Sequence, residues 1–216
     1  MDHQVDPAVV AELGSRRSLD DIVSSLSGDR SLVEAVAARS YAHPNGFDRI
    51  SLYRDPLGLE VRVHLWWTGV PSDESIHNHA WDFSSQVIVG SLRFQMLSPL
   101  PCGREYDRYS SSMPVGGRFG DYQFARTGAV RLDVVFDGTV TAGSSYSLNH
   151  EAYHRVLASP EGAPLVATIV VRGLVRRKFS NVLVPKGAAM PSHRSLRHLG
   201  GTEIVEKLQM LVRYIR

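Results

Sequence analysis

Two histidines stand one residue apart in the stretch "SIHNHAWDFSSQVIVGSL", which runs from residue 75 to residue 92. Side chains at i and i+2 of an extended strand point to the same face, so His77 and His79 project together if this segment is extended. Two neutral imidazoles in this arrangement can bind one divalent transition metal. The spacing therefore predicts two ligands of a metal site.

A third ligand is needed for tight binding, and the segment "GSSYSLNHEAYHRV" at 143–156 offers two candidates. They are His150 and His154, and the spacing of the first pair does not choose between them. Asp82 could add an oxygen ligand, although a carboxylate directly after Trp81 also suits a turn that binds backbone N–H groups.

Composition restricts the class of protein. The 216 residues suffice for one sizeable domain or two small ones, and 43% hydrophobic with 21% charged residues is ordinary for a soluble globular chain. A net charge of +2 is too small to indicate nucleic acid as a partner, and a single cysteine, Cys102, excludes an intrachain disulfide. Without a long apolar run or a secretory signal, we expect a cytoplasmic protein that binds neither nucleic acid nor membranes.

The elements that must position the histidines change character near residue 46. Residues 1–46 read as helices, with Ser18 as a possible N-cap, and "HPNG" at 43–46 ends the pattern. Residues 47–186 read as strands and turns, and 187–216 as a loop followed by a helix that Thr202 could cap. We therefore expect three parts: an N-terminal helical segment, a β-barrel, and a C-terminal helix packed on that barrel.

Short β-rich runs separated by glycine, proline and aspartate indicate many antiparallel strands without intervening helices. After strands near "DRISLYRD" and "LEVRVHLWWTG", the expected strands are 83–97, 104–112, 130–137, 144–148, 152–158, 164–173 and 179–184. The predicted fold class is mainly β, an antiparallel barrel or sandwich.

The motif spacing resembles that of the cupin superfamily over about residues 50 to 173. Cupins carry a His-x-His followed by an apolar strand that closes on a glycine, here Gly90, and a second motif with a glycine eleven positions before a histidine, here Gly143 and His154. The run "VHLWWTGVPSDESIHNH" and the "HRV" at 154–156 are similar to the thiol (cysteine) dioxygenase branch. The resemblance implies a double-stranded β-helix, also called a jelly roll, and selects His154 over His150.

The resemblance also implies a ligand set and two roles for arginines. Most cupins carry a glutamate after the second histidine, but Phe83 and Ser84 stand there in this chain. The thiol dioxygenases also lack this glutamate. This implies a site of three histidines: His77, His79 and His154. Arg54 lies at a position similar to the arginine that holds a substrate carboxylate in that branch, so we expect it to bind substrate. Arg172 stands close to the place of that branch's catalytic tyrosine, so we expect it to be catalytic.

Other candidates for the pocket follow from strand parity. In "EVRVHLWW", Arg62 and His64 share one face of the strand. They either bind substrate inside the barrel or lie in solvent outside it. The cost of burying polar groups favours the position in solvent. Gln86 is expected to face inward and bind substrate. Tyr146 and Tyr153 both flank the third ligand, and we take Tyr153 as the catalytic one.

The sequence thus predicts a metal-dependent cupin oxygenase, a non-haem dioxygenase that uses Fe(II) and O2 on a small polar molecule. Zn, Mn, Ni or Cu in the same site is the alternative, with isomerase, lyase or hydrolase chemistry, and a non-enzymatic small-molecule-binding cupin is a third possibility. Family analogy also suggests a homodimer.

Overall fold

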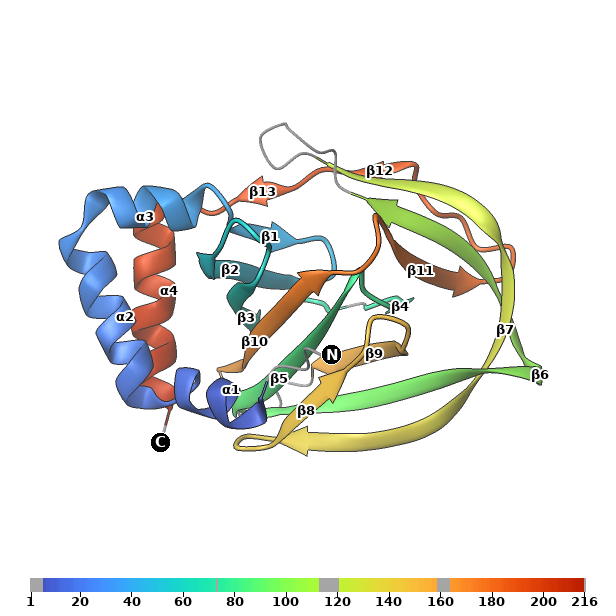
Figure 1. Cartoon of the computed structure of the whole chain (residues 1–216), viewed down its shortest axis with the longest axis horizontal. Coiled ribbons are helices and arrows are strands. Elements are labelled where there is room, and N and C mark those ends of the chain that lie inside the picture. Colours follow the sequence, from blue (N-terminus) through green and yellow to red (C-terminus); the bar gives the residue numbers. More distant parts are fainter. Residues whose placement is uncertain (1–5, 73, 113–120, 159–163, 216) are drawn as a thin grey trace.

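The computed structural model describes residues 6–72, 74–112, 121–158 and 164–215, and its fold is mainly β. Two antiparallel sheets face each other, and helices cover the outside of one of them (Figure 1). The helices are α1 (Pro7–Leu13), α2 (Arg16–Gly28), α3 (Arg30–Ala37) and α4 (Gly201–Tyr214). The expected fold class, a cupin-like arrangement of antiparallel strands with helices at both ends of the chain, is confirmed.

The first sheet has the strand order β13-β1-β2-β3-β10-β5-β8. Its strands are β1 (Tyr41–His43), β2 (Phe47–Arg54), β3 (Glu60–Trp67), β5 (Trp81–Val89), β8 (Ser145–Leu148), β10 (Leu165–Val175) and β13 (Arg197–His198). Strand β10 lies inside this sheet and pairs with β3 on one side and β5 on the other.

The second sheet has the order β11-β4-β9-β6-β7-β12. Its strands are β4 (Ile76–His77), β6 (Ser91–Ser112), β7 (Tyr122–Thr141), β9 (Tyr153–Ala158), β11 (Ser180–Pro185) and β12 (His193–Arg194). The long β6–β7 ribbon arches along the side of the molecule opposite the helices (Figure 1).

Three expected strands have different bounds in the structure. The segment 83–97 is not one strand, because Gly90 adopts φ 76° and separates β5 from β6, where a bulkier residue would be strained. The strands expected at 104–112 and 130–137 belong to the two long strands β6 and β7, because the β6–β7 ladder continues past irregular pairings at Pro99–Arg104 instead of ending there.

Two helix boundaries were also wrong. Helix α2 begins at Arg16 and is capped by Ser15, whose Oγ accepts a hydrogen bond from the Ser18 N–H at 3.2 Å, so Ser18 lies inside the first turn. Helix α4 begins at Gly201, one residue before the expected cap Thr202, and the N–H of Gly200 donates to the Glu203 carboxylate at 3.4 Å.

The main hydrophobic core lies between the first sheet and the helices. One face of β3 and β10 supplies Val63, Leu65 and Ile169, which are fully buried. Helix α4 covers them with an apolar stripe that includes Ile204, Leu208 and Leu211, as its periodicity predicted. The opposite face of the first sheet is therefore free to line the space between the sheets.

No helix in the described part of the chain is both long and apolar enough to cross a lipid bilayer.

We expect Leu208→Ala to lower the free energy of unfolding by about 2–5 kcal/mol, because Leu208 is 1% exposed beneath α4 and its truncation leaves a cavity. Met210→Ala on the same helix is the matched control, since Met210 is 42% exposed, and its cost should stay below about 0.5 kcal/mol. Urea unfolding followed by circular dichroism measures both, and equal costs would contradict this packing.

Candidate metal centre

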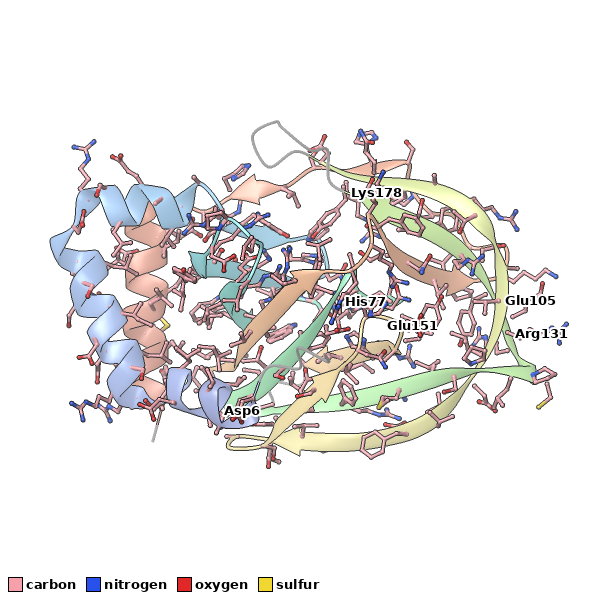
Figure 2. The ribbon with its side chains drawn as sticks, in the orientation of Figure 1. Asp6, His77, Glu105, Arg131, Glu151 and Lys178 are labelled. Carbon is pink, nitrogen blue, oxygen red and sulfur yellow. The ribbon has the colours of Figure 1, made fainter. Side chains whose placement is uncertain are left out.

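Strand pairing brings the first and third predicted ligands together. The short strand β4 lies between β9 and β11, and His77 pairs directly with His154 on β9 and with Val182 on β11. Side chains of directly paired residues project from the same face of a sheet, with Cβ atoms ~5 Å apart. His79 follows two residues after His77 and projects to the same side. Figure 2 shows His77 in the middle of the molecule, between the two sheets.

The three imidazoles converge as the sequence predicted. Their ring centroids lie 4.8 Å apart for His77 and His79, 4.5 Å for His77 and His154, and 5.1 Å for His79 and His154. One nitrogen from each ring lies within 4.8 Å of the other two. This group is therefore close enough to bind one ion jointly.

Hydrogen bonds at Nδ1 fix the tautomer of two of the rings, so that Nε2 is the atom that can bind a metal. The Nδ1 of His77 lies 2.9 Å from the Ser75 carbonyl oxygen, and the Nδ1 of His154 lies 3.3 Å from the Ala152 carbonyl oxygen. A carbonyl oxygen only accepts hydrogen bonds, so each Nδ1 carries the proton and each Nε2 keeps its lone pair for a metal. Burial, together with the nearby His77, lowers the pKa of both His79 and His154 well below 6.5. These two rings are neutral at pH 7, which is the form that binds metal.

His150 and Asp82 do not join this group. The Nδ1 and the backbone N–H of His150 each lie 2.8 Å from the Asp82 Oδ1, and Arg176 donates to the other carboxylate oxygen at 3.2 Å. The two residues considered as extra ligands thus form hydrogen bonds with each other and not with the three histidines.

Two residues that sequence reasoning missed fix the histidine segment in place. Asn78, between the two histidines, is 2% exposed, and its Oδ1 accepts a hydrogen bond from the Asn181 N–H at 2.8 Å. Arg177 donates from Nη2 to the carbonyl oxygens of His79 and His150, both at 2.6 Å. The signal in the sequence was the polar side chain of Asn78 between two predicted ligands.

The histidines form part of the wall of a cavity of about 860 Å³ between the sheets. Phe83, Tyr146 and Val156 lie near them, and a second group of aromatic residues lines the cavity further along. The cationic side chains that line it are Arg49, Arg54, Arg62, Arg172, Arg177, Lys178 and Arg194. Glu74 is the acidic side chain among the lining residues, so the described wall is strongly electropositive.

The expectation that solvent surrounds Arg62 and His64 was wrong. Helices cover the other face of β3, so Val61, Val63 and Leu65 pack against them and the polar row faces the cavity. Burial, and next the nearby Arg62, lower the pKa of His64 well below 6.5, so this ring is neutral at pH 7.

Glu60, which sequence reasoning also missed, organises three buried arginines. Its carboxylate accepts hydrogen bonds from Arg49 at 2.5 Å, Arg62 at 2.8 Å and Arg172 at 3.1 Å. Burial alone would raise the pKa of the Glu60 carboxyl, but Arg62 and Arg49 hold it well below its usual range. The signal in the sequence was the i, i+2 spacing of Glu60 and Arg62, which places both on one face of β3.

The two arginines named from the resemblance occupy different depths. Arg172 is buried beside Glu60, and burial together with Arg62 lowers its pKa to about 9. Arg54, at the end of β2, is exposed and lines the outer part of the cavity.

Two other expectations were wrong because of strand parity. Gln86 lies on the helix-facing side of β5, where its side chain lies close to Gly14, and it does not line the cavity around the histidines. Tyr153 faces the opposite way from its neighbour His154 and packs with Leu97 and Leu132. Tyr146 lines the cavity instead, and burial raises its pKa to about 12.

Comparison with known proteins gives no family. No protein-family model matches the sequence, and no curated protein matches it. Solved structures match only distantly: hydroxypropylphosphonic acid epoxidase from S. wedmorenis is 14% identical, with a TM-score of 0.38, over 62% of this chain and 54% of that chain. This chain thus spans about half the length of the epoxidase.

Two further similar structures have unrelated descriptions. One is that of the DMSP lyases RdDddP and RnDddQII, at 16% identity and a TM-score of 0.35, over 59% of this chain and 47% of that chain. Another is Drosophila melanogaster CENP-C bound to CAL1, at 9% identity and a TM-score of 0.37, over 71% of this chain and 98% of that chain. At these values the likeness carries no functional argument, which rests on the site itself.

We expect Glu60→Gln to lower the free energy of unfolding by about 3–5 kcal/mol, because it leaves three buried guanidinium groups without their shared carboxylate. The pKa of Glu60 is depressed, so its contribution is complete above the unfolded value of about 4.3 and is lost only as the pH falls below that. The loss measured by urea unfolding should therefore be the same at pH 6 and pH 8.

Glu105→Gln is the control, because Glu105 forms exposed ion pairs with Lys186 and Arg131 at the far end of the β6–β7 ribbon (Figure 2). Its cost should stay below about 1 kcal/mol. A cost for Glu60→Gln no larger than that of the control would contradict the role given to Glu60.

Proposed function

We propose that this protein is a metal-dependent oxygenase of the cupin type, which holds Fe(II) through His77, His79 and His154 and oxidises a small polar molecule with O2. The observation that carries the proposal is the convergence of three imidazoles on one wall of a substrate-sized cavity. Three protein ligands on one face of the ion leave open positions for substrate and dioxygen, which is the arrangement that non-haem iron oxygenases use.

The chain's own residues supply what the reaction needs around the ion. Trp81 stacks on His79 at 5.4 Å and Phe83 contacts the same ring edge-on at 4.9 Å, so both limit the access of water to the ligand. The raised pKa keeps the Tyr146 hydroxyl protonated at neutral pH, and it can donate a hydrogen bond to a molecule in the cavity.

A metal-dependent lyase or hydrolase is the second candidate, and Glu74 is the observation that favours it. This carboxyl lines the cavity, is 7% exposed, and accepts a hydrogen bond from the Val156 N–H at 2.6 Å. Burial raises its pKa, which makes this carboxyl a candidate to donate or accept a proton during turnover. Chemistry of this kind would need no oxygen and would run with zinc or manganese.

Anaerobic titration with Fe(II), followed by oxygen-electrode assays on small organic acids and thiols, tests the main proposal. We expect one iron per chain and oxygen consumption that depends on both iron and substrate. Turnover with zinc under nitrogen would favour the second candidate, and tight ligand binding without turnover under any condition would leave a non-enzymatic binding protein.

We expect His154→Ala to lower iron affinity at least 100-fold, because the variant keeps only two of the three histidine bonds to the ion. His150→Ala is the matched control: it removes a nearby histidine that bonds Asp82, and its iron content should equal that of the unaltered protein. Metal analysis after dialysis against Fe(II) measures both, and the reverse order of effects would refute the assignment of ligands.

A further inference from the structure

We propose that Arg62 and Arg172 bind the anionic group of the substrate, and that this substrate is an organic carboxylate with a planar apolar body. The inference deepens the proposed function and rests on it in one respect: it takes the cavity beside the three histidines as the substrate site. The pair lies deeper in the cavity than Arg54, which is exposed.

Among the described residues, the positive charge around the pair is only partly balanced by acidic side chains. Arg49, Arg62 and Arg172 are all buried, and they share the single carboxylate of Glu60. Unpaired charge is costly to bury, and a cluster with two positive charges in excess is stabilised by an anion from outside. Glu74 is the acid on the described cavity wall, and its carboxylate accepts a hydrogen bond from the Val156 N–H of the second sheet at 2.6 Å, not from these arginines.

The two arginines also keep donors free. Arg62 and Arg172 are only 6% and 5% exposed, yet in the described part of the chain the Nε–H of each has no hydrogen-bond partner. Buried polar groups are nearly always paired, and an unpaired one at a cavity wall indicates where a ligand supplies the partner. Guanidinium groups bind carboxylates through parallel N–H donors, which is why a carboxylate fits here.

Trp81 connects this pair to the metal ligands. The guanidinium carbon of Arg172 lies 4.1 Å from the centroid of the Trp81 ring, and that of Arg62 lies 5.1 Å from it. The same indole stacks on His79 at 5.4 Å. An anion on the arginines is therefore separated from the metal ligands by about the width of one side chain, which places the rest of a small molecule beside the ion.

The cavity wall next to the arginines is aromatic. Phe47 lies 4.9 Å from His64 and 5.0 Å from Trp66, measured between ring centroids, and His43 stacks on Phe47 at 4.4 Å. Burial keeps the pKa of both histidines low, so these rings are uncharged and offer flat surfaces. A volume of about 860 Å³ also exceeds what a two-carbon acid would fill.

Calorimetric titration of the metal-free protein with three probes tests the inference: benzoate, its neutral analogue benzamide, and acetate. We expect benzoate to bind at least ~10-fold more tightly than benzamide, since charged hydrogen bonds are lost in the amide. We expect acetate to bind at least ~10-fold more weakly than benzoate, since it lacks the ring. Equal affinity for benzoate and benzamide would overturn the anion site, and equal affinity for benzoate and acetate would overturn the apolar body.

Arg172→Gln assigns the site, and Lys178→Gln is the matched control, because Lys178 also lines the cavity with one positive charge but is exposed. Arg172→Gln should weaken benzoate binding ~10-fold, and Lys178→Gln by less than ~2-fold, since exposed charges contribute little. Equal losses would overturn the role of the pair in favour of general electrostatic attraction. If Arg172→Gln does not fold, the comparison of benzoate with benzamide on the unaltered protein decides.

These titrations need neither metal nor turnover, so their failure differs from failure of the proposed function. If the protein distinguishes benzoate from benzamide but consumes no oxygen, the anion site is supported and the oxygenase proposal is refuted. A protein that binds iron and consumes oxygen with thiols, but does not distinguish the probes, keeps the oxygenase and loses the anion site.

Discussion

The insertion of β4 between β9 and β11 is the constraint on which the site depends. Two residues of β4 suffice to pair His77 with His154, which are 77 positions apart in the chain. The backbone ladder fixes the distance between these two imidazoles, and the spacing of two residues then adds His79 on the same side. Asn78 points the other way and ties the segment to β11 through Asn181, so the ligand positions are held by hydrogen bonds on both sides.

The interior between the sheets departs from an ordinary core. The helix-facing side of the first sheet carries the apolar packing, which leaves its other side available for arginines, histidines and aromatic rings. The Glu60 carboxylate lowers the cost of burying the arginines because it compensates part of their charge. Three guanidinium groups still share this one carboxylate. A buried ionic cluster of this kind is weak evidence for stability, and it is the basis of our proposal that an anionic ligand binds here.

Periodicity and motif spacing predicted the parts of the site that depend on local geometry. The i, i+2 rule placed His77 and His79 together, and the resemblance to the cupin motifs selected His154. The direction in which each strand face points was predicted less well. Alternation along a strand shows which residues share a face, but it does not show which face lies inside. Both faces of β3 are buried, one by helices, so the cost of burying polar groups pointed to the wrong side for Arg62 and His64.

By itself, the sequence determined the class of fold, the presence of helices at both ends of the chain, and the three imidazoles that meet, since each follows from short-range spacing or from a motif. Only the tertiary structure decided what surrounds them. Glu60 and Arg172 are 112 positions apart, and they meet because β3 pairs with β10 through eight registered residues. Tyr146 rather than Tyr153 enters the cavity for a similar reason: the sheet to which each strand belongs sets the direction of its side chains, and strand membership depends on pairing between distant segments.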